Sequence, residues 1–168
     1  MNIKSILTIG VVVAIGVLDF IARSPSDASV EPSSTSPSAD VVTVYKTEAC
    51  GCCLNWVDHL KTNDFSVEVI NVASTATTRE KFGVPPQLLS CHTGSINGYW
   101  VEGHVPADLV QKLITETPDD IRGLSAPGMP MGSPGMEGPN PVQYEIIAYH
   151  DDGTTSVYAT RQGKEAVE

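Results

Sequence analysis

Apolar and polar residues follow one another in patterns that predict short strands and helices from residue 41 onward. Val41 to Tyr45 is a β-branched and aromatic run, which predicts a buried strand. Residues 65–72 predict a second strand, and residues 75–82 a second helix with Gly83 at its C-cap. Between the two strands, four positions share the spacing of one helix face: Cys53, Trp56, Val57 and Leu60.

A hairpin and a third helix follow. Asn97-Gly98 is a strong signal for a two-residue turn, and it joins the predicted strands Cys91–Ile96 and Tyr99–Val101. Pro106 to Thr115 has the apolar face of a helix. The order β-α-β-α-β-β-α, with a crossover helix that makes the first two strands parallel, predicts an α/β fold of thioredoxin-like plan.

The C-terminal part has a different composition. Residues 123–141 are rich in glycine and proline and carry three methionines. Val142–Tyr149 and Thr154–Thr160 flank an Asp-Asp-Gly turn, which predicts a terminal β-hairpin at the edge of the sheet. We therefore expect a thioredoxin-like metal-binding domain with a Met-rich loop over residues 40–141 and a C-terminal extension over residues 142–168.

The N-terminal 39 residues predict export. Lys4 precedes an apolar run from Ile6 to Leu18, which is typical of a signal peptide and short for a bilayer span. We interpret residues 1–23 as a signal peptide or an N-terminal membrane anchor. Residues 24–39 are rich in serine and proline and predict a flexible linker. An extracytoplasmic domain, periplasmic or tethered to the membrane, is the expected product.

The net charge and the spacing of the cysteines limit the classes of function that the chain can have. A net charge of −10 argues against nucleic acid as a partner, because phosphate contacts need a positive surface. The chain has four cysteines, and three of them lie within four residues. A disulfide framework spreads its cysteines to close loops, so this crowding indicates a different use.

Cys50-Gly51-Cys52-Cys53 lies between the first strand and the first helix, where the helix N-terminus favours thiolate. Cys50 and Cys53 have the spacing of a redox pair, so a thiol-disulfide oxidoreductase is one hypothesis. Dithiol exchange uses two sulfurs, whereas a soft metal site uses all three. The third cysteine therefore favours a metal-binding protein, with Cys53 as a buried apolar residue the alternative. Enzymatic activity stays open.

Further candidate ligands lie beyond the cluster. The loop before the hairpin should approach the first strand-helix loop and bring Cys91 to the site, unless Cys91 is a buried strand residue. His92 is a further candidate ligand, although along a regular strand it would point away from the site unless the strand is bulged there. His104 is either a ligand or a helix cap or carbonyl partner. His59 and His150 are expected to be solvated.

The methionines favour copper. Met129, Met131 and Met136 fall in a segment without helical or strand period, whereas core methionines belong to apolar faces. Thioether sulfur is a soft ligand that selects Cu(I) over zinc. Packing of the loop against the core is the alternative role. A zinc-binding or disulfide-stabilised interaction module remains as a further hypothesis.

Several unusual motifs occur along the chain in this order: Val44-Tyr45-Lys46, Cys50-Gly51-Cys52-Cys53, Ser90-Cys91-His92-Thr93, Glu102-Gly103-His104-Val105-Pro106 and Ala126-Pro127-Gly128-Met129-Pro130. In these motifs and their order the chain resembles a family of predicted metal-binding proteins of unknown function that includes the CopG-type copper-resistance proteins. The resemblance implies a thioredoxin-like fold, a periplasmic location, copper bound by the cysteines and nearby methionines, other copper-handling proteins as partners, and redox cycling of copper with the thiols.

Overall fold

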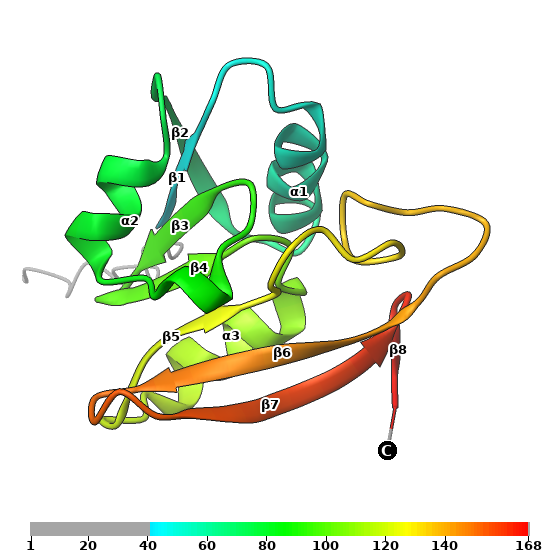
Figure 1. Ribbon diagram of the computed structural model, residues 1–168. Coiled ribbons are helices and arrows are strands. Elements are labelled where there is room, and N and C mark those ends of the chain that lie inside the picture. Colours follow the sequence, from blue (N-terminus) through cyan, green and yellow to red (C-terminus); the bar gives the residue numbers. More distant parts are fainter. Residues whose placement is uncertain (1–40, 168) are drawn as a thin grey trace, which may run out of the picture. The chain divides into compact units, whose positions relative to one another are not determined.

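The computed structural model describes residues 41–167, in which helices and strands follow the predicted order up to the third helix (Figure 1). The predicted signal peptide or anchor and the whole of the predicted linker, residues 24–39, lie outside the described residues. None of the helices within residues 41–167 combines the length and apolarity needed to cross a bilayer. The elements are β1 (Val41–Lys46), α1 (Gly51–Lys61), β2 (Ser66–Asn71), α2 (Ala76–Phe82), the 3₁₀ turn η1 (Pro86–Leu88), β3 (Thr93–Ile96), β4 (Tyr99–Glu102), α3 (Ala107–Glu116), β5 (Ile121–Ser125), β6 (Gln143–His150), β7 (Thr155–Gln162) and β8 (Glu165–Ala166).

The described strands form one mixed sheet in the order β2-β1-β3-β4-β5-β6-β7-β8. β1 and β2 are parallel and β3 and β4 antiparallel, as predicted. Asn97 and Gly98 have φ values of 48° and 90°, which is the left-handed geometry that the two-residue turn requires. Gly83 has φ 69° at the C-cap of α2, so the predicted helix end is confirmed. The mixed α/β class is confirmed as well.

Strand β5 is absent from the sequence prediction, which placed its last three residues, 123–125, in the Gly/Pro-rich segment. It runs parallel to β4 and antiparallel to β6, and so joins the predicted C-terminal hairpin to the sheet. A side chain at Gly123 would collide with the indole of Trp100. The glycine that suggested a loop therefore serves a close approach within the sheet. The two-residue strand β8 also went unpredicted.

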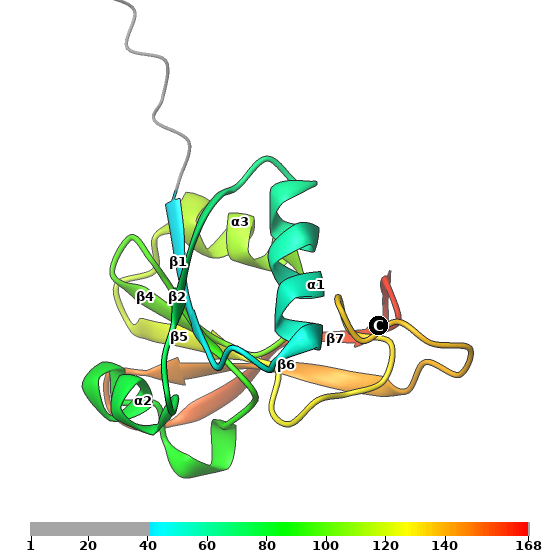
Figure 2. The ribbon, with the colours of Figure 1, turned by 90° about the horizontal axis from the view of Figure 1, so that it is seen from above.

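Two layers of helix cover the sheet (Figure 2). α1 and α3 pack on one face, where Trp56, Leu60 and Leu113 are fully buried among the apolar residues of β1, β4, β5 and β6. α2 and η1 lie over the other face, where Trp100 packs with Val84 and Leu88. Alternate residues of β4 and β6 pack into the two clusters, as the pleat of a strand requires. This layering places the N-terminus of α1 beside the loop that enters β3.

His59 links the two helices on the first face. Its Nε2 accepts a hydrogen bond of 3.0 Å from the backbone N–H of Ala107, the first residue of α3. The expectation of a solvated histidine is therefore wrong, because the polar flank of α1 meets the start of α3 in the folded chain. His150 lies at the surface, where its ring nitrogens contact Asp120 and Ser156.

Candidate metal centre

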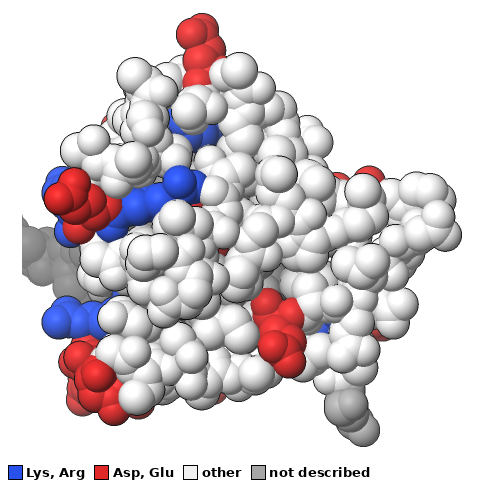
Figure 3. Space-filling view, viewed as in Figure 1, with Lys and Arg blue, Asp and Glu red and all other residues white. Residues whose placement is uncertain are grey.

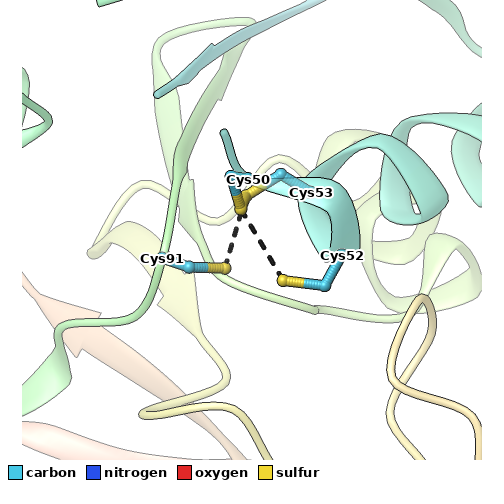
Figure 4. Close-up of side chains that lie close together, drawn as sticks. All are labelled: Cys50, Cys52, Cys53 and Cys91. Atoms are coloured by element: carbon cyan, nitrogen blue, oxygen red, sulfur yellow. Dashed lines mark hydrogen bonds between the residues drawn. A yellow bond between two sulfur atoms is a disulfide. The ribbon is translucent and has the colours of Figure 1, made fainter. Parts of the chain in front are cut away.

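The cysteine cluster lies at the N-terminus of α1. Cys50 is the N-cap residue, and a disulfide joins it to Cys53. Cys52 and Cys91 are free thiols. The Cys52 sulfur lies 3.6 Å from the Cys50 sulfur, and all four side chains converge on one point (Figure 4). The unpaired N–H groups of the first helical turn favour negative charge here, which stabilises thiolates once the disulfide is reduced.

Cys91 enters the cluster from a different part of the chain, 38 positions after Cys53. Its sulfur lies 3.5 Å from that of Cys53, 3.2 Å from His92 Nδ1 and 3.0 Å from His104 Nε2. β3 begins at Thr93, two residues later than predicted. Strand alternation therefore does not apply to Cys91 and His92, and the side chain of His92 approaches the site together with that of Cys91.

His104 presents a defined nitrogen to the cluster. Its side chain is fully buried, and its Nδ1–H donates to the carbonyl oxygen of Pro134 at 2.7 Å. This bond fixes the tautomer and leaves the lone pair of Nε2 directed at the Cys91 sulfur. The two roles weighed for this residue, carbonyl partner and ligand, therefore use different ring nitrogens and are compatible.

Burial sets the protonation of these groups. It lowers the pKa of His92 well below its ordinary value of 6.5 and also lowers the pKa of His104, so both rings are neutral at pH 7 and can donate a lone pair. Burial and the neighbouring Cys52 raise the pKa of the Cys91 thiol to about 12. A metal ion that takes Cys91 as a ligand must therefore displace its proton.

The potential ligand atoms fall into two groups, each with all its atoms within 4.8 Å of one another. One holds the four cysteines, and the other holds Cys91, His92 and His104. Cys91 belongs to both. The donor set is thiolate sulfur and imidazole nitrogen, which suits soft and borderline metal ions. In Figure 3 the surface over α1 and the loop after β5 carries few charged side chains.

The Met-rich loop between β5 and β6 closes over the start of α1. Asn55 Nδ2 lies 3.4 Å from the Gly135 carbonyl oxygen, to which it donates. A side chain at Gly135 would come within 2.9 Å of the Cys52 carbonyl oxygen. Met136 follows directly and is half-buried, whereas Met129 and Met131 are 55% and 43% exposed. The loop thus reaches the cysteine helix, and two of its three methionines are exposed residues.

Two further residues behind the site were not predicted to act there. Arg79 of α2 and the fully buried Glu102 of β4 form an ion pair of 2.9 Å that contacts the residues flanking Cys91 and His92. The signal for it was a carboxylate at the end of the otherwise uncharged strand Tyr99–Glu102. Only the fold shows that an arginine 23 positions earlier faces it.

Fold and site together define a mixed α/β protein with a cluster of cysteine and histidine side chains that can hold a metal ion. The family described as "Protein of unknown function, DUF411" matches residues 88–136, which contain Cys91, His92, His104 and the three loop methionines. No curated protein matches the chain.

Two solved structures resemble the chain, described as "Copper resistance protein copG- Form 2" and "Form 1". Each is 39% identical over 74% of this chain, with a TM-score of 0.70, and the match covers 99% and 98% of the respective structures. The chain belongs to the DUF411 family, which includes the CopG-type copper-resistance proteins.

Proposed function

We propose that this protein binds Cu(I) in an extracytoplasmic compartment and serves copper resistance. The observation that carries the proposal is the convergence of four cysteine side chains, from two separate segments, beside a neutral histidine. Reduced, the site offers Cys50, Cys52, Cys53 and Cys91 as thiolates. Thiolate and imidazole donors suit Cu(I), and the resemblance to structures named copper resistance protein supports that metal.

The histidines and methionines complete the proposed donor set. His104 Nε2 and His92 Nδ1 both lie within 3.2 Å of the Cys91 sulfur, so an ion bound there has imidazole nitrogen within reach. Met129, Met131 and Met136 are proposed as thioether donors of the loop. Such donors add affinity for Cu(I) and little for zinc. Zinc binding by the same cysteines is the competing outcome.

The disulfide between Cys50 and Cys53 supports a second, redox role. Oxidation of these two thiols to a disulfide releases two electrons and two protons. The two electrons reduce two Cu(II) ions to Cu(I), and the protons pass to water. The oxidised chain keeps only Cys52 and Cys91 as free thiols. Reduction of the disulfide therefore doubles the number of thiolates from two to four, so copper binding should depend on the redox state.

Metal analysis of the reduced protein tests copper binding. The wild type and a Cys50→Ser/Cys52→Ser/Cys53→Ser variant are reduced, incubated anaerobically with Cu(I) or Zn(II), and desalted. We expect the wild type to retain Cu(I), with short Cu–S distances in X-ray absorption, and the variant to lose most of it. Equal copper in both proteins would contradict the proposal. Preferential retention of Zn(II) would show that the site binds zinc rather than copper.

A single substitution separates metal binding from disulfide exchange. Cys52→Ser leaves the Cys50–Cys53 pair intact, so turnover on a disulfide substrate should persist while Cu(I) affinity falls. If exchange is rapid and Cu(I) affinity is unchanged in this variant, the protein is an oxidoreductase that uses two cysteines.

The proposed compartment rests on the N-terminal sequence. We infer export to the periplasm, with residues 1–23 cleaved or retained as a membrane tether, and other copper-handling proteins as partners. Cell fractionation and N-terminal sequencing of the mature chain test this, since protein recovered in the cytoplasm with residues 1–23 intact would contradict it.

A further inference from the structure

The carboxylate of Glu102 is a hub of hydrogen bonds behind the metal centre. Its side chain has no solvent exposure. Oε1 accepts from Arg79 Nε at 2.9 Å and from the backbone N–H of Ser90 at 2.8 Å. Oε2 accepts from the hydroxyl of Thr93 at 2.6 Å. Arg79 also donates through Nη2 to the carbonyl oxygen of Ser90.

These contacts bracket one dipeptide. Ser90 immediately precedes Cys91-His92, and Thr93 immediately follows it. The dipeptide lies outside strand β3, and one backbone hydrogen bond of 3.0 Å, from the Gly103 N–H to the His92 carbonyl oxygen, continues the β3–β4 pairing as far as His92. One carboxylate and its paired guanidinium thus secure both ends of an irregular segment whose two side chains approach the same site.

The chemistry of the pair favours a role in geometry. A buried ion pair contributes little net stability compared with apolar residues of the same volume, because desolvation offsets the attraction. A carboxylate with three donors and a fork-shaped guanidinium does, however, fix direction. The chain offers a contrast in the ion pair of 2.9 Å between Arg161 and Asp108, which lies in the first turn of α3 and is largely exposed.

We propose that Glu102, held by Arg79, is a positioning residue that aims the Cys91 sulfur at Cys53 and His104. The inference rests on the proposed function, because it assigns Cys91 a role in binding Cu(I). Glu102 does not itself touch the metal. It acts on affinity through Cys91, and its loss should matter only while Cys91 is present.

A double-mutant cycle tests this dependence. Glu102→Gln keeps the shape of the side chain but removes its charge and one acceptor. Cu(I) affinity is measured by competition with a chromophoric chelator for Glu102→Gln, Cys91→Ser, the double variant and the wild type. We expect Glu102→Gln to weaken binding by about 10- to 100-fold in the wild type, the range for residues that orient metal ligands, and to have little effect in Cys91→Ser. Asp108→Asn is the matched control and should leave the Cu(I) affinity unchanged in both the wild-type and the Cys91→Ser background.

A second arm needs no metal. In a Cys50→Ser/Cys52→Ser/Cys53→Ser background, Cys91 is the remaining thiol, and its rate of alkylation by iodoacetamide reports how firmly it is held. Glu102→Gln should speed this alkylation, and Asp108→Asn should not. If circular dichroism shows that Glu102→Gln does not fold, Thr93→Val removes one of the three hydrogen bonds and takes its place in both arms.

The outcomes separate the two claims. Equal losses of affinity in the wild type and Cys91→Ser, or an unchanged alkylation rate, would overturn the positioning role and leave copper binding intact. A wild type that binds no Cu(I) would overturn the proposed function, while faster alkylation of Cys91 in the Glu102 variant would still support positioning.

Discussion

The contact between the Met-rich loop and α1 gives the sharpest prediction about stability. Gly135 has φ 82°, and a Cβ there would lie 2.7 Å from the backbone nitrogen of Trp56 and 2.9 Å from the carbonyl oxygen of Cys52. Both atoms belong to the helix backbone and cannot rotate away. Gly135→Ala must therefore strain the backbone and push the loop off the helix.

The expected magnitude has two parts. A side chain in a left-handed conformation costs about 1–2 kcal/mol, and overpacking against rigid atoms costs about 1–3 kcal/mol. Gly135→Ala should lower the free energy of unfolding by about 2–5 kcal/mol. Gly128 is the matched control, because it has φ 73° with no atom within 4 Å of an added Cβ. Gly128→Ala should cost only the conformational part, about 1–2 kcal/mol.

Urea denaturation of the metal-free protein with its disulfide intact measures both variants. The difference between the two free energies isolates the contact of the loop with α1. If Gly135→Ala and Gly128→Ala destabilise the protein equally, the loop does not rest on the helix backbone and the reasoning fails.

Three further predictions concern single side chains. Burial lowers the pKa of His59 below 6.5. The contribution of neutral His59 to stability is therefore complete above pH 6.5 and is lost as the pH falls through the folded-state pKa. His59→Gln should flatten the pH dependence of the urea midpoint below pH 6.5. Trp56→Phe removes the 2.8 Å hydrogen bond from Nε1 to the buried Val105 carbonyl oxygen and should cost about 1–3 kcal/mol in the same assay. Bound Cu(I) should protect Cys52 from alkylation, with protection lost on adding a Cu(I) chelator.

A specific result would contradict each of these three predictions. If the urea midpoint of His59→Gln depends on pH as that of the wild type does, the ring nitrogen of His59 does not accept from the first residue of α3. A stability loss below about 0.5 kcal/mol in Trp56→Phe would show that the carbonyl finds another donor. Alkylation of Cys52 at the same rate with and without Cu(I) would exclude this sulfur from the metal site.

Local patterns predicted most of the fold and one half of the site. The Asn97-Gly98 turn, the Gly83 helix cap and the amphipathic spacing of α1 are short-range features, whose energetics lie within a few residues. The placement of three cysteines at a helix N-terminus followed from the same periodicity. Strand β5 was not predicted, because Gly123 indicated a loop. The glycine is needed for its close contact with Trp100, a residue distant in the sequence.

The other half of the site depends on tertiary structure. The sequence by itself determined the ligand types, the crowded cysteine motif and the helix that carries it. Only the folded sheet decided that Cys91 lies 3.5 Å from Cys53, that His104 bonds Pro134 through one nitrogen and faces Cys91 with the other, and that Arg79 pairs with Glu102. The reason is physical: these partners lie 13 to 38 positions apart, and burial of the whole core brings them together.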